Sequence, residues 1–109
     1  MKVLIDENLP VKLHLDFKKH QAFSVAFMNW QGKENGELIK VMLENEFDAL
    51  ITLDKNLQYQ QNFAKYPIVV IVIHAAKTEY KFIQPLVEEL EITLSSITQV
   101  GIHVIHQNL

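Results

Sequence analysis

Carboxylate side chains follow apolar runs at two places in this chain and open a helix-like segment at a third. Asp6 and Glu7 come directly after the first apolar run, Asp54 follows a later one, and Glu37 begins a segment with helical periodicity. Carboxylate oxygens are the ligands that Mg²⁺ and Mn²⁺ prefer, and such cations can activate water for attack on a phosphodiester. The sequence therefore offers Asp6, Glu37 and Asp54 as candidate catalytic metal ligands, with Glu7 as a further ligand.

Several residues in and near these segments also have a purely structural explanation. Asn8 can cap the helix that follows it, and Asp54 can cap a short helix of its own, because Asn and Asp favour N-cap positions. Glu37 suits the first turn of a helix because the helix dipole favours negative charge there. Trp30 is either a packing anchor or a stacking platform for a base, and packing is the more common role. The five histidines show no metal-ligand spacing and are interpreted as surface or core residues.

Alternating segments of two kinds must position these side chains. Apolar, β-rich runs predict strands at 3–5, 23–27, 47–53, 68–73 and 101–106, and helical periodicity predicts helices at 11–20, 37–46 and 80–97, with a loop and short helix at 55–63. Pro10 suits the first turn of a helix, and Glu88, Glu89 and Glu91 are expected on an outward helix face.

This order predicts an α/β fold, a three-layer α/β/α sandwich with a mainly parallel central sheet and an edge strand at 101–106. Ligands of open parallel sheets bind at the carboxyl ends of the strands. If the strands at 3–5 and 47–53 are neighbours, Asp6 and Asp54 face each other at a topological switch point.

Length and composition indicate one soluble domain. The 109 residues, 49% of them hydrophobic, suit a single core over residues 1–109. No cysteine is present, the start of the chain does not resemble a signal peptide, and the run 68–73 is too short to cross a bilayer, so we expect a cytoplasmic protein without a membrane role. The net charge is −3 and every basic residue is a lysine, which disfavours tight metal-free binding of nucleic acid.

Three segments together resemble a known family. They are VLIDENLP at 3–10, WQGKENGEL at 30–38 and TLDKNLQYQQN at 52–62. The chain resembles the PIN-like, VapC-toxin-related proteins that begin with a Leu-Asp-Glu-Asn-Leu-Pro signature, from Met1 to about His74. The opening signature combined with the later Asp-Lys pair is fairly specific, whereas either alone is weak.

The resemblance implies a PIN-like fold and a ribonuclease activity that depends on Mg²⁺ or Mn²⁺, often in a toxin-antitoxin setting. It places Asp6, Glu37 and Asp54 at the acidic positions and Glu7 within the signature. Asn8, Lys55 and Asn56 become candidates for phosphate contact or for support of the ligands. RNA is the implied substrate, a cognate antitoxin the implied protein partner, and a homodimer a further expectation.

Two departures from the family pattern leave alternatives open. No fourth acidic residue follows Asp54, because 58–62 is uncharged, and KNLQ stands where many relatives have another Asp and an aromatic residue. A catalytically degenerate interaction module is therefore one alternative. A receiver-like signalling domain is another, since Asp6, Glu7 and Asp54 mimic its acidic residues, but the lysine that such domains need after the last strand is missing from 106–109.

Overall fold

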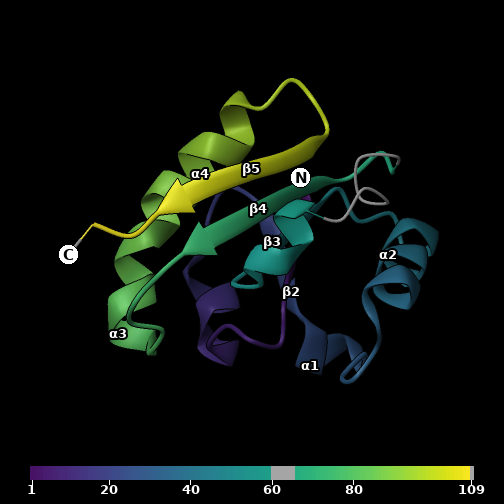
Figure 1. Ribbon diagram of the computed structural model, residues 1–109, viewed down its shortest axis with the longest axis horizontal. Helices are drawn as coiled ribbons and strands as arrows, with labels where there is room; N and C mark the ends of the chain where they lie inside the picture. Colours follow the sequence, from purple (N-terminus) through teal and green to yellow (C-terminus); the bar gives the residue numbers. More distant parts are fainter. Residues whose placement is uncertain (60–65, 109) are drawn as a thin grey trace.

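Five parallel strands form one sheet in the computed structural model, which describes residues 1–59 and 66–108 (Figure 1). The strands are β1 (Lys2–Ile5), β2 (Gln21–Ser24), β3 (Ala49–Thr52), β4 (Val69–His74) and β5 (Gly101–His106), in the spatial order β2-β1-β3-β4-β5. This is the strand order of the flavodoxin-like doubly wound folds, in which the winding reverses between β1 and β3. The first and third strands are neighbours, which meets the condition under which Asp6 and Asp54 were expected to face each other.

The register between β1 and β3 determines where, along the strand direction, the polar residues after these strands lie. Leu4 pairs with Leu50 and Ile5 with Ile51, and the backbone N–H of Asp6 donates to the Ile51 carbonyl at 3.0 Å. Asp6 therefore emerges level with the end of β3, at the carboxyl edge of the sheet.

Both faces of the sheet are buried, which explains the unbroken apolar runs of its strands. One face carries Val3, Ile5, Ile51 and Ile71 and packs against η1, α3, η4 and α4. These elements span Val11–Asp16, Tyr80–Ile83, Gln84–Leu86 and Val87–Ser96. The other face is covered by α1 (Val25–Met28), α2 (Asn35–Glu44) and η2 (Lys55–Tyr59). The predicted α/β/α sandwich is confirmed.

The first crossover differs from its prediction at both ends. A helix was expected over 11–20, but η1 is a six-residue 3₁₀ helix, and Phe17 after it is extended and buried. A strand was expected over 23–27, but β2 ends at Ser24 and α1 follows at once. The Ser24 hydroxyl accepts a hydrogen bond from Phe27 N at 3.0 Å, so Ser24 is an N-cap that starts a helix within an apolar run.

The predicted helix at 80–97 forms as three consecutive segments, α3, η4 and α4. Pro85 lies in the middle segment, and it lacks the N–H that an unbroken α-helix would use there. Glu88 and Glu89 are exposed as expected, but the outward placement of Glu91 was wrong, because Glu91 is 7% exposed. The edge strand at 101–106 is confirmed, whereas residues 60–63 of the loop predicted at 55–63 lie outside the described residues.

Candidate functional site at the carboxyl edge of the sheet

The carboxylate of Asp6 is held by hydrogen bonds to both of its oxygens. Oδ1 accepts from the backbone N–H of Glu7 at 2.8 Å, and Oδ2 accepts from the Thr52 hydroxyl at 2.7 Å. One bond is local and the other crosses from β1 to β3. The side chain is therefore fixed at the switch point.

Thr52 connects the residues on the two sides of this point. Its side chain is fully buried, and its Oγ1 accepts from Asn8 Nδ2 at 3.2 Å and from the backbone N–H of Asp54 at 3.1 Å while donating to Asp6. One hydroxyl thus contacts all three polar residues. Thr52 was not among the predicted site residues, because a Thr at the end of a strand is common and gives no local signal of such a role.

Asn8 joins the site and does not cap a helix. Its Oδ1 accepts from Leu53 N at 3.2 Å, and the N-cap position of η1 is Pro10, which forms no side-chain cap. The capping explanation for Asn8 was therefore wrong. Its amide links the loop after β1 to the loop after β3.

Asp54 begins the short η2 helix, as its structural explanation predicted. Its Oδ1 accepts from Asn56 N at 3.0 Å, and its carbonyl accepts from Leu57 N at 3.2 Å. Asn56 contributes this backbone N–H. Asp54 nevertheless lies at the same edge as Asp6, whose carboxylate it influences electrostatically.

The electrostatics of Asp6 reflect its burial among like charges. Burial raises the pKa of Asp6 above its ordinary value, and the neighbouring carboxylates of Glu7 and Asp54 raise it further. The hydrogen bonds from Thr52 and from the Glu7 N–H act in the opposite direction without cancelling the increase. Asp6 and Asp54 are thus near enough to repel each other.

Glu7 ties this edge to the loop that precedes α2. Its Oε1 accepts from Gly32 N at 3.2 Å, and Gly32 has a φ of +78°, a conformation that favours glycine. Trp30, in the same loop, packs against the core with its ring 5.6 Å from that of Phe47. The packing interpretation of Trp30 is therefore supported.

Glu37 occupies a different setting from the other predicted ligands. It lies in the first turn of α2, its side chain is 67% exposed, and its Oε2 is 4.0 Å from Lys33 Nζ. Within residues 1–59 and 66–108, no group of three or more His, Asp or Glu side chains is arranged to hold a metal ion. The structure brings Asp6 and Asp54 together without assembling the triad, and the role of Glu37 stays a prediction.

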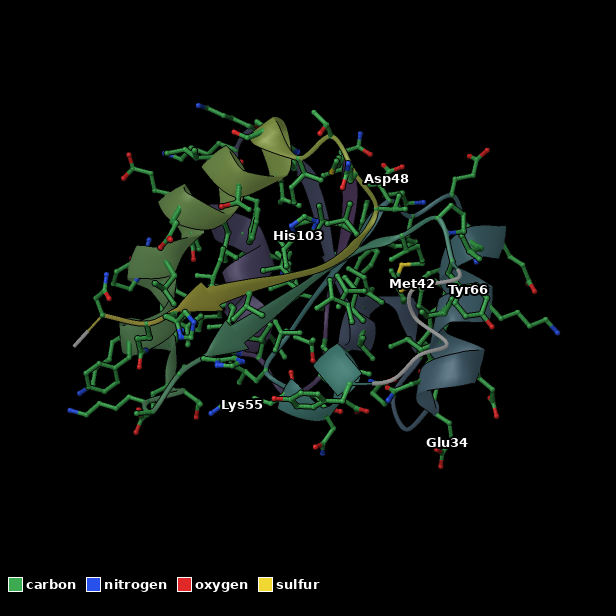
Figure 2. The ribbon with its side chains drawn as sticks, turned by 45° about the horizontal axis from the view of Figure 1, so that its top comes forward. Glu34, Met42, Asp48, Lys55, Tyr66 and His103 are labelled. Carbon is green, nitrogen blue, oxygen red and sulfur yellow. The ribbon has the colours of Figure 1, made fainter. Side chains whose placement is uncertain are left out.

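Basic side chains border the acidic pair. His74 and His106 end the neighbouring strands β4 and β5 in register, with ring centroids 4.9 Å apart. Burial lowers the pKa of His74, and the charges of His106 and Lys55 lower it further, so Lys55 lies within electrostatic reach of His74. In Figure 2, Lys55 marks this edge of the sheet and Asp48 the opposite one. The histidines were not predicted as site residues because their spacing is not that of metal ligands, although His74 and His106 fall at the ends of predicted strands.

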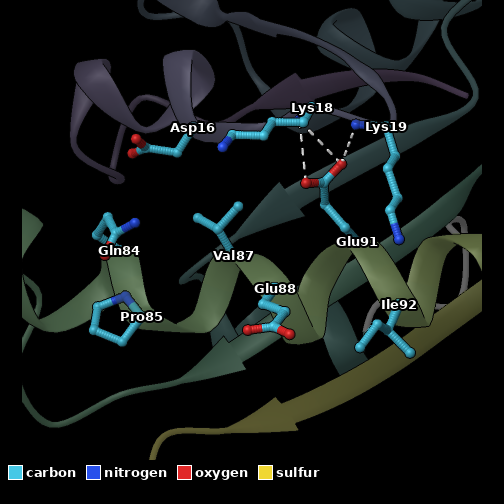
Figure 3. Close-up of a pocket in the computed structure, with 9 residues that line it drawn as sticks. All are labelled: Asp16, Lys18, Lys19, Gln84, Pro85, Val87, Glu88, Glu91 and Ile92. Atoms are coloured by element: carbon cyan, nitrogen blue, oxygen red, sulfur yellow. Dashed lines mark hydrogen bonds between the residues drawn. The ribbon is translucent and has the colours of Figure 1, made fainter.

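A hollow lies elsewhere among the described residues, between the η1–β2 connection and α4 (Figure 3). It has a volume of about 590 Å³, and Glu91 lies at its wall with both carboxylate oxygens bonded to backbone N–H groups of Lys18 and Lys19, at 2.6 to 3.2 Å. Burial would raise the pKa of Glu91, but these hydrogen bonds and the nearby charges of His20 and Lys19 lower it overall. Both carboxylate oxygens of Glu91 already accept hydrogen bonds, so we interpret Glu91 as a structural residue. We call these bonds, which join α4 to the η1–β2 connection, the clamp.

No protein-family model matches this chain, and comparison with curated proteins and with solved structures gives no significant match. The PIN-like assignment therefore rests on the sequence motifs alone. None of the helices formed by the described residues is long and apolar enough to cross a membrane.

Proposed function

We propose that this protein is a metal-dependent phosphodiesterase of the ribonuclease type, with its catalytic centre at the carboxyl ends of β1 and β3. One observation carries the proposal: Asp6 and Asp54 meet around the buried hydroxyl of Thr52, at the point where the winding of the sheet reverses. Ligands of doubly wound sheets bind at such points. The family resemblance supplies the reaction class.

The pair of carboxylates fits a hard divalent cation. Mg²⁺ is commonly held by one or two carboxylates, with waters and substrate phosphates as its other ligands. The raised pKa of Asp6 has like-charge repulsion among its causes, and a cation shared with Asp54 removes this repulsion. Asp6 and Asp54 would hold Mg²⁺ or Mn²⁺, with Glu7 and Glu37 as further predicted ligands. The bound metal would supply an activated water and neutralise charge on the phosphate.

The remaining polar side chains have supporting roles in the proposal. The Thr52 hydroxyl orients Asp6, and the Asn8 amide links the loop after β1 to the end of β3. Lys55, together with imidazole N–H groups of His74 and His106, would contact phosphate oxygens of the RNA backbone. These donors would attract the phosphates of RNA locally. The chain as a whole does not attract a polyanion, because its net charge is −3.

The test is cleavage of single-stranded RNA by the purified protein with Mn²⁺, Mg²⁺ or a chelator. We expect cleavage with metal only, its loss in Asp6→Asn and Asp54→Asn, and a decrease of roughly 10- to 100-fold in Thr52→Val, because groups that orient metal ligands typically contribute this much. Glu89→Gln, an exposed carboxylate on α4, is the matched control and should cleave like the parent.

Undiminished cleavage by Asp6→Asn would reject the assignment. Metal-independent cleavage that survives purification of the Asp6→Asn variant would indicate a contaminating nuclease. A folded parent that neither cleaves RNA nor responds to metal would favour the degenerate interaction module. RNA as substrate, a cognate antitoxin and a homodimer are the partners that this proposal carries from the resemblance.

A receiver-like phosphoacceptor is a second candidate, because receiver domains share this strand order. Asp54 would then be the residue phosphorylated, with Asp6 and Glu7 as the acidic pair beside it. Residues 107 and 108 after β5 are Gln and Asn, so the expected lysine is missing there. Incubation with a small acyl-phosphate donor and Mg²⁺, followed by mass measurement, separates the two candidates: only the receiver gains a phosphoryl group.

A further inference from the structure

The β5 strand leaves one edge of the sheet open among the described residues, and its composition does nothing to protect that edge. β5 pairs with β4 on one side and is the last strand in the sheet order. Natural edge strands are usually kept from pairing with other chains by charges, proline, bulges or short length. β5 has six residues, GIHVIH, and residues 97–109 contain no Lys, Arg, Asp, Glu or Pro.

The other edge of the sheet differs. β2 has four residues, and its last residue, Ser24, turns the chain directly into α1. Of the two sheet edges formed by residues 1–59 and 66–108, the β5 edge therefore offers the longer uncharged row of backbone groups.

The backbone direction along β5 follows from its bonds to β4. Gly101 N donates to the Ile68 carbonyl and Gln107 N to the His74 carbonyl, both across the β4–β5 ladder. Backbone groups of a strand alternate in direction, so the odd-numbered residues face β4 and the even-numbered residues face outward. Ile102, Val104 and His106 thus present their N–H and C=O groups at the open edge.

Exposed apolar side chains lie on both sides of this edge. Val104 is 36% exposed on the face shared with Val72, and Val100, just before the strand, is 55% exposed. On the opposite face, Ile92 of α4 is 55% exposed and borders a hollow of about 410 Å³ that His103 of β5 also lines. The edge therefore offers apolar contact area as well as hydrogen bonds.

We propose that two copies of this chain associate through β5, paired antiparallel about a two-fold axis at Val104 into one continuous sheet. Val104 of one copy lies opposite Val104 of the other, and Ile102 of each lies opposite His106 of the other. All three residues then exchange backbone hydrogen bonds in the pattern of an antiparallel pair. The arrangement is isologous, so it closes as a dimer. No formal charge on the strand opposes it.

A second copy fits this edge because the outward-facing backbone groups of Ile102, Val104 and His106 lie symmetrically about Val104, so one strand supplies both sides of the antiparallel pair. A strand pair alone buries less area than a permanent interface, so we expect a dimer that dissociates on dilution. Ile92 and Val100 from each copy add apolar area around the strand pair.

The test is sedimentation velocity of the full chain over a range of concentrations. We expect a monomer–dimer equilibrium in the parent, weakened roughly tenfold or more in Val104→Lys, because two lysines would then lie directly opposite each other. Gln21→Lys, which adds the same charge to an exposed position of the other edge strand, should dimerise like the parent. A monomer at all concentrations, or a dimer that Val104→Lys leaves intact, overturns the proposal.

Amide hydrogen exchange gives a second measurement that needs no substitution. We expect protection of the Ile102, Val104 and His106 amides to rise with protein concentration, while the Gly101 amide, bonded within the chain, stays constant. Equal exchange at high and low concentration would contradict the paired edge, as would a parent that remains monomeric and binds an extended peptide there. RNA cleavage is not a readout here, so the dimer and the nuclease can fail separately.

Discussion

Thr52 shows what the sequence could and could not predict at the scale of single residues. That Asp6 and Asp54 could meet followed from two carboxylates placed after two buried strands, on the condition that these strands are neighbours. The role of Thr52 could not be predicted because Thr is common in strands and its hydroxyl usually finds a local partner. Its three contacts depend on the register that sets Ile5 beside Ile51, and that register is a tertiary property.

The ionised side chain of Asp6 is predicted to lower the free energy of unfolding at neutral pH. Because its pKa is raised in the folded protein, the folded state binds the proton more tightly than the unfolded state, and stability falls as pH rises from the unfolded to the folded pKa. Asp6→Asn should therefore melt at the same or a higher temperature than the parent near pH 7. Asn can still accept from Glu7 N and contact the Thr52 hydroxyl.

Thermal unfolding at about pH 7 and about pH 3 measures this effect. The advantage of Asp6→Asn should shrink at the lower pH, where Asp6 is protonated in both folded and unfolded states. A variant less stable than the parent near pH 7 would show that the carboxylate contributes more through its hydrogen bonds than burial costs.

At the scale of elements, the clamp between α4 and the η1–β2 connection explains where the sequence analysis went wrong. The pattern predicted one longer helix over 11–20 and an outward Glu91. Instead the chain is extended after η1, and its N–H groups at Lys18 and Lys19 donate to Glu91, which is 73 and 72 residues away in the sequence. Hydrophobic periodicity cannot reveal a buried carboxylate, because a glutamate on a helix usually faces water.

Glu91→Gln should destabilise the fold by about 1 to 3 kcal/mol, the usual cost of disrupting hydrogen bonds from buried donors to a charged acceptor. The lowered pKa gives the pH dependence: the contribution of Glu91 is present above its unfolded pKa and is lost as pH falls through its folded pKa. Urea unfolding at about pH 7 and about pH 3 checks both points, with Glu88→Gln as the exposed control. An equal loss of stability at the two pH values would show that the negative charge of Glu91 is not the cause.

At the scale of the whole molecule, the strand order decides where chemistry can occur. Most strands and the layers could be predicted because buried parallel strands have continuous apolar runs in their sequence. It could only state as a condition that the first and third strands are neighbours, since pairing between distant segments leaves no local signal. That neighbourhood creates the switch point, and with it the candidate site.

The most direct test of this account is a titration with Mn²⁺ followed by NMR, because the paramagnetic ion broadens the amide signals nearest to it. We predict that low Mn²⁺ concentrations broaden the amides of Asp6, Glu7, Leu53 and Asp54 and spare those of α4, and that Asp6→Asn abolishes the effect. Broadening at Glu37 as well would add it to the ligands. Signals at Asp6 and Asp54 that stay sharp at millimolar Mn²⁺ would contradict the metal site on which the proposed nuclease depends.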